Sequence, residues 1–306
     1  MAEIRPVQYS KEVQKLVFPD NSFHVHSVRE SGIADTVTAV EKPVQGKIRE
    51  AKTGEPESLP LKIYRPLDSK ISYETQLVYA EPLLVESPSE FALNYNKRAL
   101  KQQQQADEIN TKVANIAATN WGPTKSDNII LTTGTARASH ITGIAGNRKA
   151  LTKDDMLALH NLILRMSAAG QWFMLANADI HTDLLKIPEF VDYYKTGNET
   201  ALRNGIVGKI LNLNILLRST DAGHIGLMYN SSKEKKAEGA KIAASDLPAS
   251  LIWNDKFVCS AEGRMRTAVN TSPAGFLGST IIEAWTRFGA DIIREDERGV
   301  IALLEA

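Results

Sequence analysis

The stretch that decides the fold is SPSEFALNYNKRALKQQQQADEINTKVANIAATNWGP, residues 87–123. Its first residues predict the start of a helix, because Ser87 can cap the free N–H groups, Pro88 suits the first helical position and Glu90 completes a capping box. The Gly-Pro pair at the far end breaks a helix. The stretch therefore predicts one helix from about Pro88 to Asn120.

This helix is unusually long and thinly apolar. Roughly 33 residues at about 1.5 Å rise make a rod near 50 Å, whereas helices of globular proteins usually run about 8–20 residues. Four consecutive glutamines, residues 102–105, interrupt its apolar stripe, so it lacks the sustained seam of a coiled coil. The stripe comprises Phe91, Tyr95, Ala106, Ile109, Val113, Ile116 and Ala117. We expect the glutamine face to contact neighbouring copies of the chain; a partly exposed structural helix is the alternative.

Composition limits the classes of partner. The chain has 306 residues, of which 43% are hydrophobic, and its 36 acidic residues balance 36 basic ones. Zero net charge gives no general attraction to nucleic acid or to an anionic membrane. One cysteine, Cys259, excludes internal disulfides and fits a reducing compartment. Since no signal-peptide-like or membrane-spanning apolar run is present, we expect a soluble protein made inside the cell.

The region before the rod is extended. Residues 1–33 show no strong period and predict an arm that lies on another surface. Residues 34–86 are strand-like, and the run KISYETQLVYAEPLLV, residues 70–85, alternates apolar and polar side chains. One predicted face comprises Ile71, Tyr73, Thr75, Leu77 and Tyr79. We expect a long two-stranded antiparallel ribbon with its tip near Lys52 to Ser58, and such a ribbon needs a surface to lie against.

The region after the rod predicts an α+β body. A helix capped by Thr152 and ended by Gly170 precedes the buried strand candidate QWFMLA, and a short helix then starts at Asn177. KILNLNILLRS, residues 209–219, predicts one alternating strand, and the last residues, 291–306, predict a hairpin with a charged turn. Further strand candidates are HIGLMY, ASLIW, KFVCSA and RMRTAV.

Motifs for catalysis or ligand binding are weak throughout. GIAGNRKALT lacks the Gly-Lys-Ser/Thr of a phosphate loop. His24 and His26 would share one side of a strand, but no cluster of further metal ligands accompanies them. Cys259 is most simply a small buried residue. We therefore predict no catalytic residue, no cofactor and no metal site.

One acid–base cluster is the alternative from another functional class. Asp179, His181 and Asp183 could serve a hydrolase, although acidic residues in the first turn of a helix are also expected from the helix dipole. The remaining histidines, His140, His160 and His224, are isolated in the sequence.

Arm, ribbon, rod and mixed body follow one another in the order of a known family. This order resembles the major capsid proteins of tailed bacteriophages, the Hong Kong 97 fold. The segments that resemble family elements are residues 88–121 (spine helix), 151–186 (axial helix, strand and short helix), 204–219 (Gly-rich turn and core strand), 250–263 (return to the peripheral domain) and 287–306 (closing strands).

The resemblance implies a division of the chain into six parts. These are an N-terminal arm at 1–33, an extended β-hairpin loop at 34–86, a peripheral domain with the spine helix at 87–150, an axial domain at 151–254, a return to the peripheral domain at 255–290 and a closing hairpin at 291–306.

The resemblance also implies a non-enzymatic shell subunit that forms pentamers and hexamers around double-stranded DNA, in a virion assembled in the host cytoplasm. Implied partners are other copies of the chain, portal, scaffolding and decoration proteins, and packaged DNA without sequence-specific binding; no membrane is implied. Because no scaffolding-like segment precedes the arm, we expect scaffolding to be separate, removed or absent. An encapsulin-like nanocompartment is the alternative within the same fold.

Overall fold

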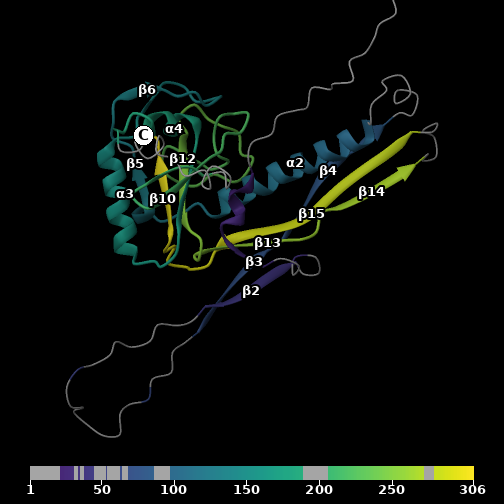
Figure 1. Ribbon diagram of the computed structural model, residues 1–306, viewed down its shortest axis with the longest axis horizontal. Helices are drawn as coiled ribbons and strands as arrows, with labels where there is room; N and C mark the ends of the chain where they lie inside the picture. Colours follow the sequence, from purple (N-terminus) through teal and green to yellow (C-terminus); the bar gives the residue numbers. More distant parts are fainter. Residues whose placement is uncertain are drawn as a thin grey trace, which may run out of the picture.

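The computed structural model describes residues 21–30, 34, 38–44, 53, 63, 68–85, 97–188, 206–271 and 279–306. These form a compact body joined to a narrower extension, with a two-stranded ribbon leaving their junction (Figure 1). Helices and sheets are mixed along the chain, which confirms the α+β prediction. Among the described helices, none combines the length and the apolar character that crossing a membrane requires.

The body is built on a seven-stranded sheet in the order β5-β16-β12-β8-β10-β9, with β11 paired to β12. Its strands are β5 (Ile129–Leu131), β8 (Trp172–Ala176), β9 (Ile206–Ile210), β10 (Leu213–Leu217), β11 (Met228–Tyr229), β12 (Leu247–Asn254) and β16 (Val300–Leu304). A small hairpin, β6 (Ala136–Ala138) and β7 (Asn147–Lys149), lies beside it.

Successive side chains of each strand point to opposite faces of this sheet, and each face is packed in a different hydrophobic core. One face, represented by Met174 and Ile252, packs under α3 (Lys153–Met166) and α4 (Ala178–Leu184). The other face, represented by Leu175 and Trp253, packs with the rod and the 3-10 helix η1 (Ser22–Val25). Both faces are buried, which explains the nearly continuous apolar runs of the strands.

Both body helices begin where the sequence predicts. The Thr152 side chain accepts from the Asp155 N–H at 3.2 Å while the Asp155 carboxylate accepts from the Thr152 N–H at 2.9 Å, a reciprocal capping box. Asn177 caps α4 by accepting from the Ile180 N–H. The predicted end of α3 at Gly170 is wrong. The helix ends at Met166, and Ser167 rather than a glycine adopts the left-handed conformation at its C-cap.

The extension is built on β15 (Thr280–Ile292), the longest described strand. Near its C-terminal end β15 pairs with β13 (Val258–Glu262), which itself pairs with β1 (Val28–Arg29). Along its first half β15 lies between β14 (Arg266–Thr271) and β4 (Gln76–Val85). The strand therefore runs from the body to the far end of the extension (Figure 1).

The rod is α2 (Lys97–Asn120), and it packs on β15 and β4. Four residues of the predicted stripe, Ile109, Val113, Ile116 and Ala117, are at most 3% exposed, whereas Ala106 is half-buried. Trp121 follows the helix in the core and donates through Nε1 to the Cys259 carbonyl at 3.0 Å. The predicted helix end is confirmed, while the predicted first turns, residues 88–96, lie outside the described residues.

One of the four glutamines faces the sheet, contrary to the prediction of a solvated or shared face. The bulge in β4 explains it: pairing passes from Leu83–Ile282 to Ala80–Ala284, so two residues of β4, one of them a proline without an N–H, stand opposite a single residue of β15. Gln105, 2% exposed, donates through Nε2 to the carbonyls of Glu81 (3.0 Å) and Ile282 (3.2 Å).

The predicted ribbon is confirmed as β2 (Ala39–Val44) paired antiparallel with β3 (Ser69–Glu74). Its base is buried, because Val40 and Tyr73 pack with Cys259 and Ala261 of β13. The predicted tip, residues 52–58, lies outside the described residues except Thr53.

The predicted single face of residues 71–79 is wrong beyond Thr75. Val78 is buried, whereas Leu77 and Tyr79 are 52% and 68% exposed. The reason is a change of sheet: the chain leaves the ribbon at Thr75 and enters the extension as β4, which reverses the alternation. Gly289 of β15 permits this crossing, since a Cβ there would lie 2.8 Å from the Glu74 carbonyl oxygen.

Two further predictions of strand pairing are corrected. KILNLNILLRS is a hairpin between β9 and β10, because Leu211 and Asn212 both adopt positive φ at a tight turn. The closing residues do not pair with one another: β15 belongs to the extension and β16 to the body. A charged turn has the same sequence pattern whether it joins two paired strands or connects two different sheets. In this turn the buried Glu297 carboxylate accepts hydrogen bonds from the N–H groups of Thr124 and Lys125.

Replacing Gln105 by Met should destabilise the subunit by about 1–3 kcal/mol, because two buried carbonyls lose their donor. The matched control is Gln103→Met, an exposed glutamine on the same helix, which should change stability by no more than about 0.5 kcal/mol. Denaturant unfolding followed by circular dichroism measures both. Equal stability of the two variants would contradict this assignment of Gln105.

Candidate functional site

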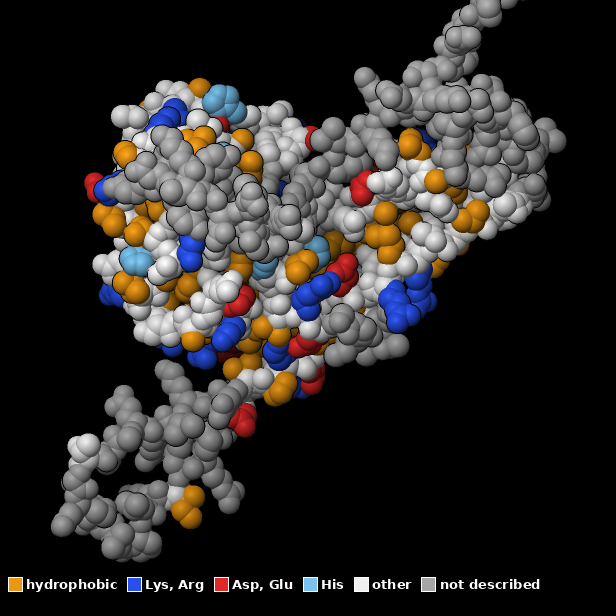
Figure 2. Space-filling model, viewed as in Figure 1, with side chains coloured by type: hydrophobic (Ala, Val, Ile, Leu, Met, Phe, Trp, Pro, Cys, Tyr) orange, Lys and Arg blue, Asp and Glu red, His pale blue; other side chains and the backbone are white. Residues whose placement is uncertain are grey.

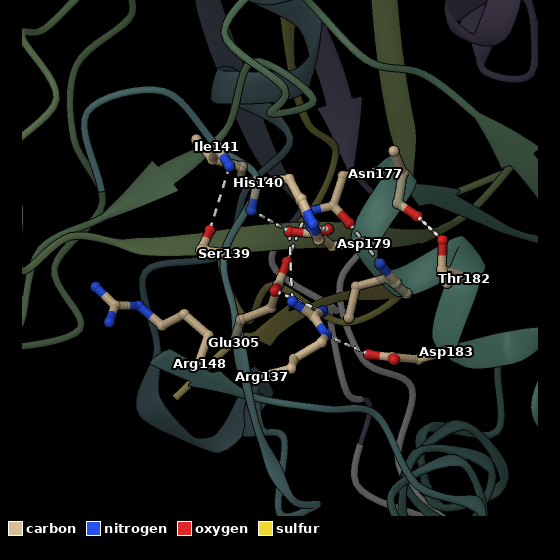
Figure 3. Close-up of polar contacts among 12 residues, drawn as sticks. Arg137, Ser139, His140, Ile141, Arg148, Asn177, Asp179, Thr182, Asp183 and Glu305 are labelled. Carbon is tan, nitrogen blue, oxygen red and sulfur yellow. Dashed lines mark hydrogen bonds and ion pairs between the residues drawn. The ribbon is translucent and has the colours of Figure 1, made fainter. Parts of the chain in front are cut away.

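The predicted acid–base cluster is organised around an arginine that the sequence analysis did not single out. Asp179 and Asp183 lie four residues apart on α4 and face Arg137 of β6, as Figure 3 shows. Arg137 Nε donates to Asp183 Oδ2 at 2.8 Å, and Nη2 donates to Glu305 Oε2 at 2.8 Å. Nη1 lies 3.3 Å from Asp179 Oδ2. One guanidinium thus joins three carboxylates from two distant parts of the chain.

Every carboxylate oxygen of this cluster has at least one partner, and for Glu305 Oε2 that partner is Arg137 itself. Asp179 accepts from the His140 N–H at 3.0 Å, and its other oxygen lies 2.5 Å from His140 Nδ1. The remaining partners are Lys186 and the Leu151 N–H on Asp183, and the Asn177 amide on Glu305. A general base needs an accessible oxygen, so this arrangement opposes the hydrolase hypothesis.

Burial and charge act against each other on the pKa values. For Asp183, burial favours the neutral acid, but hydrogen bonds from Lys186 and Arg137 outweigh it and leave the pKa lowered. For Glu305, burial dominates and raises the pKa, although Asn177 and Arg137 lower it. Burial alone lowers the pKa of His181, which favours its neutral form.

The cluster is therefore a clamp between elements. It ties together β6, α4 and the residue that follows β16. The Asp183 and Glu305 side chains are fully buried, and such charges need their counter-ions to remain ionised. A lone glutamate directly after the apolar run VIALL was the available sequence signal.

The other sequence candidates are structural. His24 and His26 lie on or beside a 3-10 helix rather than a strand; His26 stacks on Phe173 at 4.2 Å, while His24 Nε2 lies 3.6 Å from Glu262. Among the described residues, no group of histidine, cysteine and acidic side chains could hold a metal ion. Cys259 is fully buried, and burial raises its pKa to about 11.

The stretch that was compared with a phosphate loop, residues 143–152, instead contains β7, the second strand of the β6–β7 hairpin. Its Arg148 is buried and donates through Nη2 to the carbonyls of Ala244 and Asp246, both at 3.0 Å. The guanidinium is therefore directed into the fold rather than toward a ligand.

The features that remain open to a partner are surfaces, and the first is the outer face of the extension sheet. Tyr79 of β4 stands opposite Trp285 of β15, which stands opposite Arg266 of β14. With Leu77 and Arg287, which are also paired across the strands, they form a continuous apolar and basic surface on the side away from α2. Hydrophobic side chains are visible along the extension in Figure 2.

The second surface is a groove of about 430 Å³ between α2 and the edge of β4 that pairs with no described strand. Glu81 on the strand and Glu108 on the helix line it and are exposed. The third is the outer face of α3, where Leu157 and Leu164 are 46% and 64% exposed, seven residues apart on one side of the helix. Apolar side chains of this size on a helix face are typical of contact surfaces.

Comparison with known proteins identifies the fold. No protein-family model and no curated protein matches the chain. Solved structures match over nearly its whole length: the capsid of Ralstonia phage GP4 (TM-score 0.69, 12% identity, 99% of this chain and 95% of that one), Mycobacterium phage Che8 (0.63, 14%, 99% and 98%) and the capsid of the Cyanophage P-SCSP1u (0.65, 13%, 99% and 93%). The chain has the fold of these phage structures.

Replacing Arg137 by Met should destabilise the subunit by about 3–5 kcal/mol at pH 7, because buried carboxylates lose their counter-ion. Uncompensated carboxylates bind protons more tightly in the folded state, so the deficit should shrink as pH falls through the ordinary pKa values of Asp and Glu, 3.8 and 4.5. Denaturant unfolding at pH 7 and at pH 4 measures this.

The matched control is Lys70→Met, which removes the cation of an exposed ion pair with Glu41 at a similar distance, 2.7 Å. It should cost no more than about 1 kcal/mol at either pH. A pH-independent loss in the Arg137 variant would mean that packing, and not charge, is what the guanidinium supplies.

Proposed function

We propose that this chain is the major capsid protein of a tailed bacteriophage, which self-assembles into pentamers and hexamers of an icosahedral shell around double-stranded DNA. The observation that carries the proposal is the match to phage capsid structures across 99% of the chain. At 12–13% identity the match concerns the fold, so the surfaces of the subunit supply the second line of support.

Those surfaces are better suited to contacts between subunits than to catalysis. The ribbon, the apolar and basic sheet face and the exposed leucines of α3 all leave contact area unused in a single copy. The best acid–base candidate, at Asp179 and Asp183, has its carboxylate oxygens engaged in a clamp. Both observations support a structural, non-enzymatic role.

The proposed location is the virion. The remaining proposed partners are portal, scaffolding and decoration proteins, together with packaged DNA bound without sequence specificity. Zero net charge supports weak DNA affinity of the free subunit, because Lys and Arg contacts to phosphates supply most non-specific binding. A nanocompartment shell would share the fold, but the reported structural matches come from phages and favour the phage assignment.

The purified protein should form closed particles, which negative-stain electron microscopy detects directly. Deleting residues 45–61 should leave a folded body that no longer forms shells, because a two-stranded ribbon is marginal by itself and we expect its outer part to lie on a neighbouring subunit. Circular dichroism establishes folding, and light scattering follows assembly.

In a second variant, a Gly-Ser linker of equal length replaces the same residues and controls for the shortened connection. It keeps the spacing between β2 and β3 but removes the side chains, and it should also fail to assemble. Wild-type particles from either variant would show that the ribbon is dispensable, and a wild-type protein that stays monomeric under all conditions would contradict the shell assignment.

A further inference from the structure

The two edges of the extension sheet carry opposite charge. Along the first half of β15 the order is β14-β15-β4, so β14 and β4 lie on opposite sides of one strand. Arg264 and Arg266 are exposed at the start of β14. Glu81 and Glu108 are exposed at the other edge, in the groove between β4 and α2. The extension is therefore polarised across its width although the whole chain has zero net charge.

The basic edge combines exposed arginines with apolar side chains. Arg264, Arg266 and Arg287 line a shallow hollow with Leu77 and Trp285, and none of the described residues in that lining is acidic. Met265, between the first two arginines, is 37% exposed. Figure 2 shows basic side chains gathered on the extension beside hydrophobic ones. Arginines next to an aromatic side chain are well suited to a carboxylate-bearing protein surface.

The acidic edge has an excess of hydrogen-bond acceptors. Among the described residues that line the groove, Lys112 is the one cation. It is paired with Glu238 at 2.5 Å, so no other described basic residue of that lining neighbours Glu81 and Glu108. Gln105 also lines the groove, and its buried Oε1 has no hydrogen-bond partner among the described residues. A 2% exposed amide with an unpaired acceptor favours an occupant that brings N–H donors.

We propose that the β14 edge of one subunit binds the α2–β4 groove of the next, with Arg264 and Arg266 facing Glu81 and Glu108. The occupant is a second copy, because the chain itself carries the complementary donors and apolar side chains. A subunit cannot satisfy its own groove, since the two edges point away from each other across three strands, about 10 Å of sheet. The contact is heterologous, and repeated rotation about such a contact closes a ring.

The inference rests on the proposed function, since it specifies which surfaces meet inside a capsomer. It differs from the ribbon contact because it uses the sheet edges and no residue of the ribbon. Apolar side chains at both edges, Met265 beside the arginines and Leu83 in the lining of the groove, would supply burial while the charges select the partner edge and its orientation.

Charge reversal tests the pairing. The Glu81→Lys/Glu108→Lys variant and the Arg264→Glu/Arg266→Glu variant should each lose particles in light scattering and microscopy, because like charges then meet at every contact. All four substitutions combined in one chain should restore particles. Each variant should keep a melting temperature within ~2 °C of the wild-type value, since the altered side chains are exposed.

The matched control is Lys256→Glu/Glu295→Lys, which reverses exposed charges on the body and should assemble normally. Either edge variant assembling like the wild type would overturn the proposal. Loss of particles in both edge variants without recovery in the combined chain would also overturn it, because the two edges would then face other surfaces.

Crosslinking distinguishes failure of this contact from failure of the shell assignment. In a Glu108→Cys/Arg266→Cys chain, a short bismaleimide should join copies into a ladder on a denaturing gel, whereas each single variant should not; Cys259 is fully buried. Shell formation without crosslinked products would refute the edge contact but would remain consistent with the capsid function. A ladder from a protein that never forms shells would keep the contact and refute the capsid function.

Discussion

The packing of α2 on the β4–β15 pair is the constraint on which the rest of the molecule depends. The first part of β15 pairs with β4 in the extension, and its C-terminal part pairs with β13 next to the body. The contacts that hold β15 in place therefore also set the orientation of the extension relative to the body. The helix buries Ile109, Val113 and Ile116 against this sheet, and its last turn delivers Trp121 to a cluster with Phe23 and Trp253, with ring centroids 5.7–5.9 Å apart. The rod thus packs along the extension sheet and on one face of the body sheet within a single continuous core.

A bulge in the strand under a helix would normally leave carbonyls without donors, which is costly in a buried setting. Gln105 resolves this because its amide reaches two carbonyls on different strands. A leucine would complete the apolar stripe but leave both carbonyls unpaired. The polarity of the rod at this point therefore serves the subunit's own core, while Gln103 two residues earlier remains exposed.

The sequence predicted helix ends, strand candidates and the order of parts, because capping, Gly-Pro breaks and apolar runs are local signals. It failed where the outcome depends on which sheet a strand joins. The alternation around Thr75 reads as one strand, yet Gly289 of a segment more than 200 residues away lets the chain cross from one sheet to another. The Arg137 clamp was missed for the same reason: Arg137, Asp183 and Glu305 meet only in the folded chain. The boundaries assigned to the six parts remain predictions.

The chain has zero net charge, but its charged side chains are distributed unevenly over the extension. A uniformly charged subunit would repel its copies, and a uniformly neutral one would associate without a preferred orientation. Arginines on one edge of the sheet and glutamates on the other leave the net charge at zero. They favour a head-to-tail arrangement, in which opposite edges meet, over arrangements in which two like-charged edges meet. Exposed pairs are weak individually, and salt screens them over a Debye length of about 10 Å at 0.1 M. Such contacts suit an assembly in which each bond is reversible, so that a misplaced subunit can leave, and in which stability comes from the number of contacts that closure completes.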